Sequence, residues 1–110
     1  MDTNKLTTDL LAARSAALGA AEAVGPSGAQ IGSANYDHVV LAGVRWTPDV
    51  QTAVEAAGMS GYREGRNAIG FAGPFAAGSW LCSSRTAAVE AAADLLRARG
   101  WDASVNYVLD

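Results

Sequence analysis

The stretch YDHVVLAGVRWTPDV, residues 36–50, decides the fold, because a strand-like run passes directly into a helix signal within it. Residues 36–46 are rich in β-branched and aromatic side chains and are apolar on both faces in the middle, which is typical of a central strand. Thr47, Pro48 and Asp49 then supply an N-cap, a first-turn proline and a carboxylate near the positive end of the helix dipole. A strand followed at once by a helix is therefore expected.

Downstream of this stretch, the sequence predicts the rest of a helix and then a hairpin. Apolar residues continue at helical spacing through residues 50–57, and Gly58 is a suitable stop. Residues 60–66 are polar and indicate a loop. Two short apolar runs, 67–72 and 76–83, follow this loop and predict the two strands of a hairpin.

The C-terminal third predicts one more helix and one more strand. Apolar side chains recur at helical spacing from Ser83 or Ser84 to Arg99, and Gly100 ends the helix. Residues 101–109 show the clearest apolar-polar alternation in the chain, which predicts a strand with one buried face.

The element order over residues 36–110 is thus β-α-β-β-α-β, the split βαβ pattern of the ferredoxin-like fold. Right-handed crossovers predict an antiparallel sheet of strand order 4-1-3-2 with the helices on one face. The expected fold class is α+β.

The N-terminal segment precedes this core. Apolar residues at helical spacing predict an amphipathic helix over residues 1–24, and the glycine- and serine-rich residues 25–35 predict a linker. We expect the helix to be a semi-independent arm on the α+β core of residues 36–110. The whole length, 110 residues, suits a single domain.

Composition excludes several classes of function. A net charge of −3 gives no basic surface for nucleic acid, and no apolar run reaches the roughly 20 residues that span a bilayer. No secretory signal is recognisable at the N-terminus, and the single cysteine, Cys82, permits no intrachain disulfide. The sequence therefore predicts a cytosolic protein with neither a nucleic-acid nor a membrane partner.

The residues with the most reactive side chains do not form a catalytic motif. His38 is the only histidine, and the predicted fold places it on a strand next to the one that carries Cys82. A nucleophilic pair would need an orienting group and an oxyanion pocket, so we expect both residues to pack. One histidine and one cysteine cannot complete a structural zinc site, and no metal, cofactor or catalytic residue is predicted.

A weak candidate for a ligand site lies in the polar loop and at one end of the sheet. Arg63 and Arg66 form a local charge cluster that could hold a carboxylate or a phosphate. The predicted topology places Trp46 and Trp101 near each other and near this loop. The candidate ligand-binding residues are therefore Trp46, Arg63, Arg66 and Trp101, against the simpler interpretation of a solvated loop and core-filling tryptophans.

Two functions are consistent with these patterns. The first is a non-enzymatic binding or assembly module that associates with itself or with another protein through its open sheet face or its N-terminal helix. A subunit of a larger particle, such as a phage-type structural or host-interaction protein, is one version of it. The alternative is a small-molecule-binding domain or small enzyme with a pocket between sheet and helices, using polar groups from His38, Arg45, Arg63 and Arg66.

Overall fold

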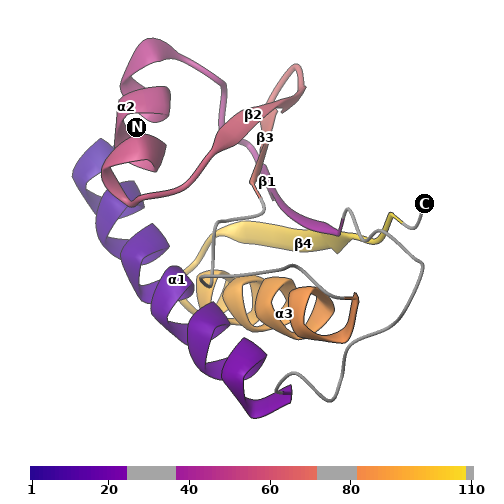
Figure 1. Cartoon of the computed structure of the whole chain (residues 1–110). Coiled ribbons are helices and arrows are strands. Elements are labelled where there is room, and N and C mark those ends of the chain that lie inside the picture. The colour runs from indigo at the N-terminus through magenta and orange to yellow at the C-terminus, as the bar shows by residue number, and fades with distance from the viewer. Residues whose placement is uncertain (25–36, 72–81, 109–110) are drawn as a thin grey trace.

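The computed structural model describes residues 1–24, 37–71 and 82–108, which form three helices and one four-stranded antiparallel sheet (Figure 1). The elements in chain order are α1 (Thr3–Val24), β1 (His38–Ala42), α2 (Pro48–Ala56), β2 (Gly61–Gly65), β3 (Ala68–Phe71), α3 (Cys82–Ala98) and β4 (Asp102–Asn106). The predicted α+β class and antiparallel sheet are confirmed.

The sheet has the strand order β2-β3-β1-β4, and the register defines its two faces. Leu41 of β1 lies opposite Ile69 of β3 and Ala103 of β4. Directly opposite residues share a face, and all three are buried, so this face carries the core. The other face, called the open face below, carries His38, Val40, Tyr62, Gly70, Ser104 and Asn106.

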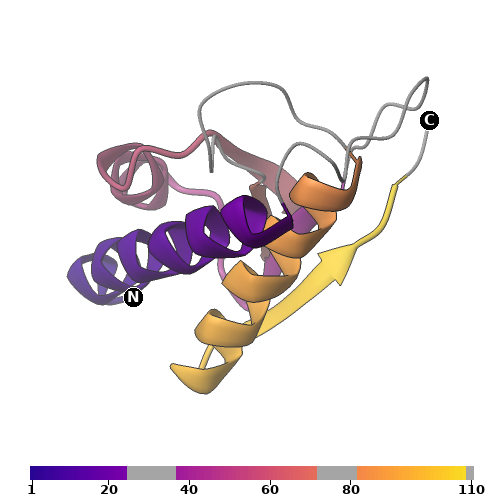
Figure 2. The ribbon, with the colours of Figure 1, turned by 60° about the horizontal axis from the view of Figure 1, so that its bottom comes forward.

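Helix α1 packs into the same core instead of forming a separate arm. It lies between α2 and α3 and contacts both (Figure 2). One stripe of the helix is buried: Leu6, Leu10, Ala13, Ala17 and Ala21. The small alanines let the helices approach closely, so the stripe that suggested a tethered arm is the contact surface of a helix docked within its own chain.

A buried carboxylate ties α1 to the junction of α3 and β4. Asp9 is only 4% exposed and accepts from Nζ of Lys5 at 2.7 Å, Nη1 of Arg99 at 2.9 Å and Nε1 of Trp101 at 2.8 Å. Nζ of Lys5 also lies 4.6 Å from the centre of the Trp101 ring. Burial raises the pKa of Asp9, but the three donors outweigh it and bring the pKa down to about 2. We call these four residues the Asp9 clamp.

The helix boundaries follow the signals in the sequence. The Thr47 hydroxyl accepts from the backbone N–H of Val50 at 3.2 Å, which confirms the predicted N-cap of α2. Gly58 and Gly100 adopt positive φ, 76° and 94°, after α2 and α3, as glycine does where a helix ends. Gly43 also has a positive φ, 79°, and it ends β1 before the predicted limit of residue 46.

The hairpin is displaced toward the N-terminus from its predicted position. Its first strand, β2, covers residues predicted to be a polar loop, and β3 covers most of the predicted first strand. Of the predicted second strand, residues 76–81 lie outside the described residues, and Cys82 and Ser83 begin α3. The physical reason is that β2 is an edge strand whose three central residues are exposed, so it has no apolar pattern.

Two other predictions concern the linker and membrane-spanning helices. The predicted linker, residues 25–35, lies outside the described residues. Within the ranges that are described, no helix combines the length and the apolar character needed to cross a bilayer.

Candidate functional site

Three arginines gather around a tryptophan at the β2 edge of the sheet. A cleft of about 330 Å³ is lined by Arg45, Trp46, Thr47, Arg63 and Arg66, and we call it the arginine cleft. Three of the four candidate residues predicted from the sequence, Trp46, Arg63 and Arg66, line this cleft together.

The cleft is built from two neighbouring segments of the chain. Arg45, Trp46 and Thr47 belong to the connection between β1 and α2. Gly61 of β2 makes room for the indole, since a Cβ atom at Gly61 would lie 3.2 Å from Cζ3 of Trp46 and 3.0 Å from Cγ1 of Val54. The glycine therefore brings the Trp46 ring against the strand that carries Arg63.

The three arginines of the cleft have no carboxylate partner within ion-pair distance among the described residues. Among the described residues, Arg45, Arg63 and Arg66 form no ion pair, and Nε of Arg63 donates only to the Gly65 carbonyl at 3.3 Å. Thr47 adds the N-terminus of α2, where the helix dipole is positive. In a chain of net charge −3, this cleft concentrates positive charge.

Trp101 does not join this cleft. Its indole N–H donates to Asp9, and the residue directly precedes β4, whereas Trp46 lies against β2. Strands β2 and β4 form opposite edges of the sheet. Trp46 thus packs against Gly61 of β2, and Trp101 bonds to Asp9 of α1.

A second polar group lies on the open face of the sheet. Oε1 of Glu64 lies 3.1 Å from Nε2 of His38 and 3.5 Å from Nδ2 of Asn106, and the two nitrogens are 3.4 Å apart. The rings of His38 and Tyr62 meet edge to face with centroids 5.7 Å apart. These four residues, His38, Tyr62, Glu64 and Asn106, are called the His38 cluster.

Two backbone features allow this cluster to form across β3. The register between β2 and β3 shifts between Arg63 and Gly65, so Glu64 is the extra residue of a β-bulge. On β3, a Cβ atom at Gly70 would lie 2.8 Å from the Tyr62 ring and 2.9 Å from Oε2 of Glu64. The bulge and the glycine together let Glu64 reach over β3 to His38 on β1.

The contacts within the cluster are consistent with two donors on one carboxylate oxygen. With its proton on Nε2, His38 donates to Glu64, and the amide of Asn106 donates to the same oxygen. Burial raises the pKa of Tyr62, the charge of Glu64 raises it further, and Arg85 opposes the rise. The cluster is thus a polar network centred on Glu64.

The sequence contains signals for this network, but its predicted strands do not bring the residues together. His38 was expected to neighbour Cys82 on a strand, but Cys82 begins α3. The composition of residues 60–66 predicts a loop, whereas Glu64 lies in β2 and reaches His38. The alternation of Tyr62 and Glu64 around Arg63 was the signal that could have placed both residues on one face of a strand.

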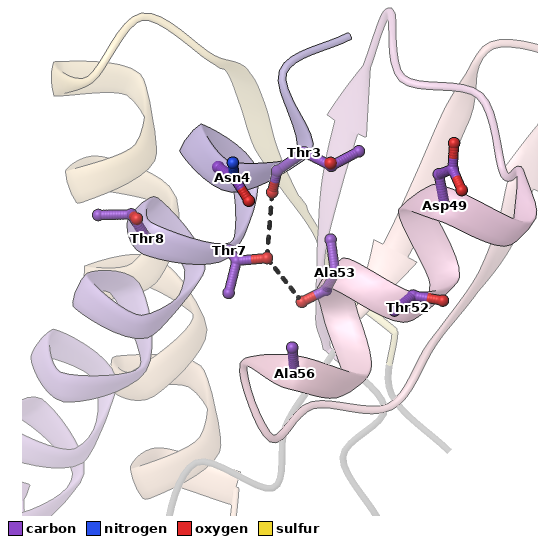
Figure 3. Close-up of a pocket in the computed structure, with 8 residues that line it drawn as sticks. All are labelled: Thr3, Asn4, Thr7, Thr8, Asp49, Thr52, Ala53 and Ala56. Carbon is purple, nitrogen blue, oxygen red and sulfur yellow. Dashed lines mark hydrogen bonds between the residues drawn. The ribbon is translucent and has the colours of Figure 1, made fainter.

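A second concave region, of about 520 Å³, lies between α1 and α2, and half of the residues that line it are threonines (Figure 3). The Thr7 hydroxyl lies 3.0 Å from the Thr3 carbonyl and 3.3 Å from the Ala53 carbonyl of α2. The second of these contacts joins α1 to α2, so we interpret this groove as part of the α1 docking surface.

Comparison with known proteins adds no functional information. No protein family model, curated protein or solved structure matches the chain.

Proposed function

We propose that the protein is a small-ligand-binding domain and that the arginine cleft holds an anionic molecule. The observation that carries this proposal is the gathering of three arginines without a carboxylate partner among the described residues. Arginines that are not paired with a carboxylate keep their N–H donors available and create a positive potential that attracts an anion.

The chemistry of the lining favours a phosphate or carboxylate group. Guanidinium groups present paired N–H donors that match both of these anions. The N-terminus of α2 contributes further positive potential at Thr47, and Trp46 offers an indole beside the charged end. The volume of about 330 Å³ lies at the small end of the range for ligand sites.

Two features make this function preferable to the assembly module. The N-terminal helix is docked on α2 and α3 of its own chain, so its apolar stripe is already covered. The open face of the sheet carries His38, Glu64 and Asn106, so it is not an apolar surface that requires a partner.

The proposal is tested by calorimetric titration of the full chain with inorganic phosphate, pyrophosphate and citrate at low ionic strength. We expect saturable binding of at least one of the three, weakened at least about tenfold in Arg63→Gln/Arg66→Gln because two charge-assisted contacts are lost. The matched control is Arg97→Gln, which removes an arginine that lies outside the cleft and pairs with Asp94. It should bind the anions as tightly as the parent does.

Absence of binding by all three anions, or equal weakening in the Arg97→Gln control, would contradict the proposal. A loss that appears only in the cleft variant supports it. Circular dichroism of each variant checks that the fold is retained.

Self-association is a second candidate, and the sheet edges favour it. Among the described strands, β2 and β4 each have a partner on one side only, which leaves backbone donors and acceptors available for another strand. Light scattering over a range of concentrations tests this: a defined oligomer supports it, and a constant monomer mass removes it.

We infer a ferredoxin-like arrangement for residues 37–108. The strand order supports this inference, since it is 4-1-3-2 when read from the β4 edge, and so does the β-α-β-β-α-β element order. Helix α1 is then an addition that lies between the two helices of that arrangement.

A further inference from the structure

We propose that the His38 cluster is a binding site for a divalent first-row transition-metal ion of the Zn²⁺ or Co²⁺ class. The proposal is independent of the arginine cleft, which faces the other side of β2. It rests on three polar atoms from three strands that lie close together on the open face: Nε2 of His38, Oε1 of Glu64 and the side-chain amide of Asn106.

The spacing of the three atoms matches that of ligands around one metal ion. With bonds of about 2.1 Å, ligand atoms lie about 3.0 Å apart in octahedral geometry and about 3.4 Å apart in tetrahedral geometry. The three sides of the triangle in this protein are 3.1, 3.4 and 3.5 Å. Two of these distances are long for hydrogen bonds but suitable for ligands that share an ion.

The exchange of hydrogen bonds for metal bonds is chemically simple. The ion takes the place of the proton on Nε2 of His38, which is released to solvent, and Glu64 binds as the carboxylate. Rotation of the Asn106 amide by half a turn exchanges Nδ2 for Oδ1 and turns a lone pair toward the ion. The ligand set is then one imidazole nitrogen and two oxygens, a set in which the imidazole favours Zn²⁺ or Co²⁺ over Ca²⁺ and Mg²⁺.

The backbone holds the candidate ligands in place. The bulge at Glu64 and the missing side chain of Gly70 aim the carboxylate at His38, as described above. The side chains of His38 and Glu64 are only 10% and 25% exposed. Such positioning lowers the entropy lost when the ligands are fixed around an ion.

Three ligands that carry one negative charge between them should bind a metal ion with moderate affinity and leave part of its coordination shell open. Among the described residues, no three histidine, cysteine, aspartate or glutamate side chains lie together so that they could hold a metal ion, and the proposed site uses the amide of Asn106 as its third ligand. This differs from the closed four-ligand zinc site excluded from the sequence, and it leaves at least one coordination position for water.

The test uses the untagged full chain after treatment with a chelator, titrated with Co²⁺ and then with Zn²⁺ as competitor. His38 is the only histidine, so its imidazole gives a single set of proton resonances, which we expect to shift and broaden on Co²⁺ binding. Cys82→Ser is the control for thiol binding and should leave the affinity unchanged.

The sharpest variant is Asn106→Asp, which places a second carboxylate 3.5 Å from Oε1 of Glu64. Without metal, repulsion should lower the melting temperature; with Co²⁺ or Zn²⁺, this variant should bind at least about tenfold more tightly than the parent because a charged ligand replaces a neutral one. A purely structural network predicts the destabilisation but no metal-dependent recovery.

Glu64→Gln should weaken Co²⁺ binding at least about tenfold, since the only charged ligand is lost. The proposal is overturned if the parent does not bind either ion at millimolar concentration. It is also overturned if Glu64→Gln binds like the parent, or if Asn106→Asp shows no gain in affinity.

Discussion

The Asp9 clamp and the arginine cleft both contain charged side chains, but only those of the clamp are paired with opposite charges. In the clamp, one carboxylate that is 4% exposed is matched by Lys5, Arg99 and Trp101. In the cleft, Arg45, Arg63 and Arg66 line one hollow and have no carboxylate partner in the described part of the chain. The charges of the first region are paired with one another, and those of the second are not paired with any described residue.

This difference indicates how much each group of charges contributes to the stability of the fold. A polar group that is buried and matched stabilises one arrangement of the chain, because its partners lose their acceptor if the arrangement changes. An exposed group of like charges adds little to the stability of the fold, because solvent screens the charges. Removing charges from the two regions should therefore have different consequences.

The largest expected effect is that of Asp9→Ala. It leaves the indole N–H of Trp101 without its acceptor and two cations without their anion, and we expect the free energy of unfolding to fall by about 2–3 kcal/mol. Urea denaturation measures this loss. As a control, Asp94→Asn removes the carboxylate of an exposed ion pair with Arg97 and should change the free energy of unfolding by less than about 0.5 kcal/mol.

The comparison of two arginines should give the next largest effect. Arg99→Gln removes one donor from Asp9 and should cost about 1–2 kcal/mol, whereas Arg63→Gln in the cleft should change the unfolding free energy by less than about 0.5 kcal/mol. The same urea experiment compares them. Equal losses would mean that the cleft is also a structural region.

Acid should weaken the clamp specifically. The pKa of Asp9 in the folded protein is about 2, below its ordinary value of 3.8, so the carboxylate contributes stability above pH 3.8 that is lost as pH falls toward 2. Allowing for solvent screening, we expect this contribution to be on the order of 1 kcal/mol. Urea denaturation at several pH values between 5 and 2 measures the free energy of unfolding. Its decrease between pH 5 and pH 2 should be smaller in Asp9→Asn than in the parent by this amount.

The smallest effect is expected at an exposed pair. The Tyr107 hydroxyl donates to Oε2 of Glu90 at 2.6 Å, and this bond raises the pKa of Tyr107 above its ordinary value of 10.0, with burial and nearby charge adding to the rise. Its stabilising contribution is therefore present below pH 10 and lost as the tyrosine ionises. Tyr107→Phe should leave the free energy of unfolding at pH 7 almost unchanged. In an ultraviolet titration, one tyrosine of the parent should ionise at a higher pH than the same tyrosine in Glu90→Gln.

Much of the fold could be predicted because local signals agreed with one another. Thr47, Pro48 and Gly58 mark the ends of α2, and the alternation after Gly100 marks β4. Strand β2 could not be found in this way, because an exposed edge strand of polar residues has the same composition as a loop.

The candidate sites were predictable to the extent that their residues are close in sequence. Arg63 and Arg66 were grouped from their spacing, and Trp46 was added from the topology. The His38 cluster was missed because it depends on a bulge at Glu64 and on a glycine at position 70, and neither feature has a distinctive sequence pattern. The bond between Trp101 and Asp9 depends on the docking of α1, which the helical spacing of residues 1–24 does not predict.

The docking of α1 against the far end of the chain has a consequence for synthesis. Asp9 and its partner Arg99 are 90 residues apart, so at about 5–20 residues per second the ribosome makes the second roughly 5–20 s after the first. Throughout that interval the apolar stripe of α1, including Leu6 and Leu10, has no α3 to cover it. The nascent chain must therefore pass through a stage in which its first helix is exposed to chaperones and to other chains.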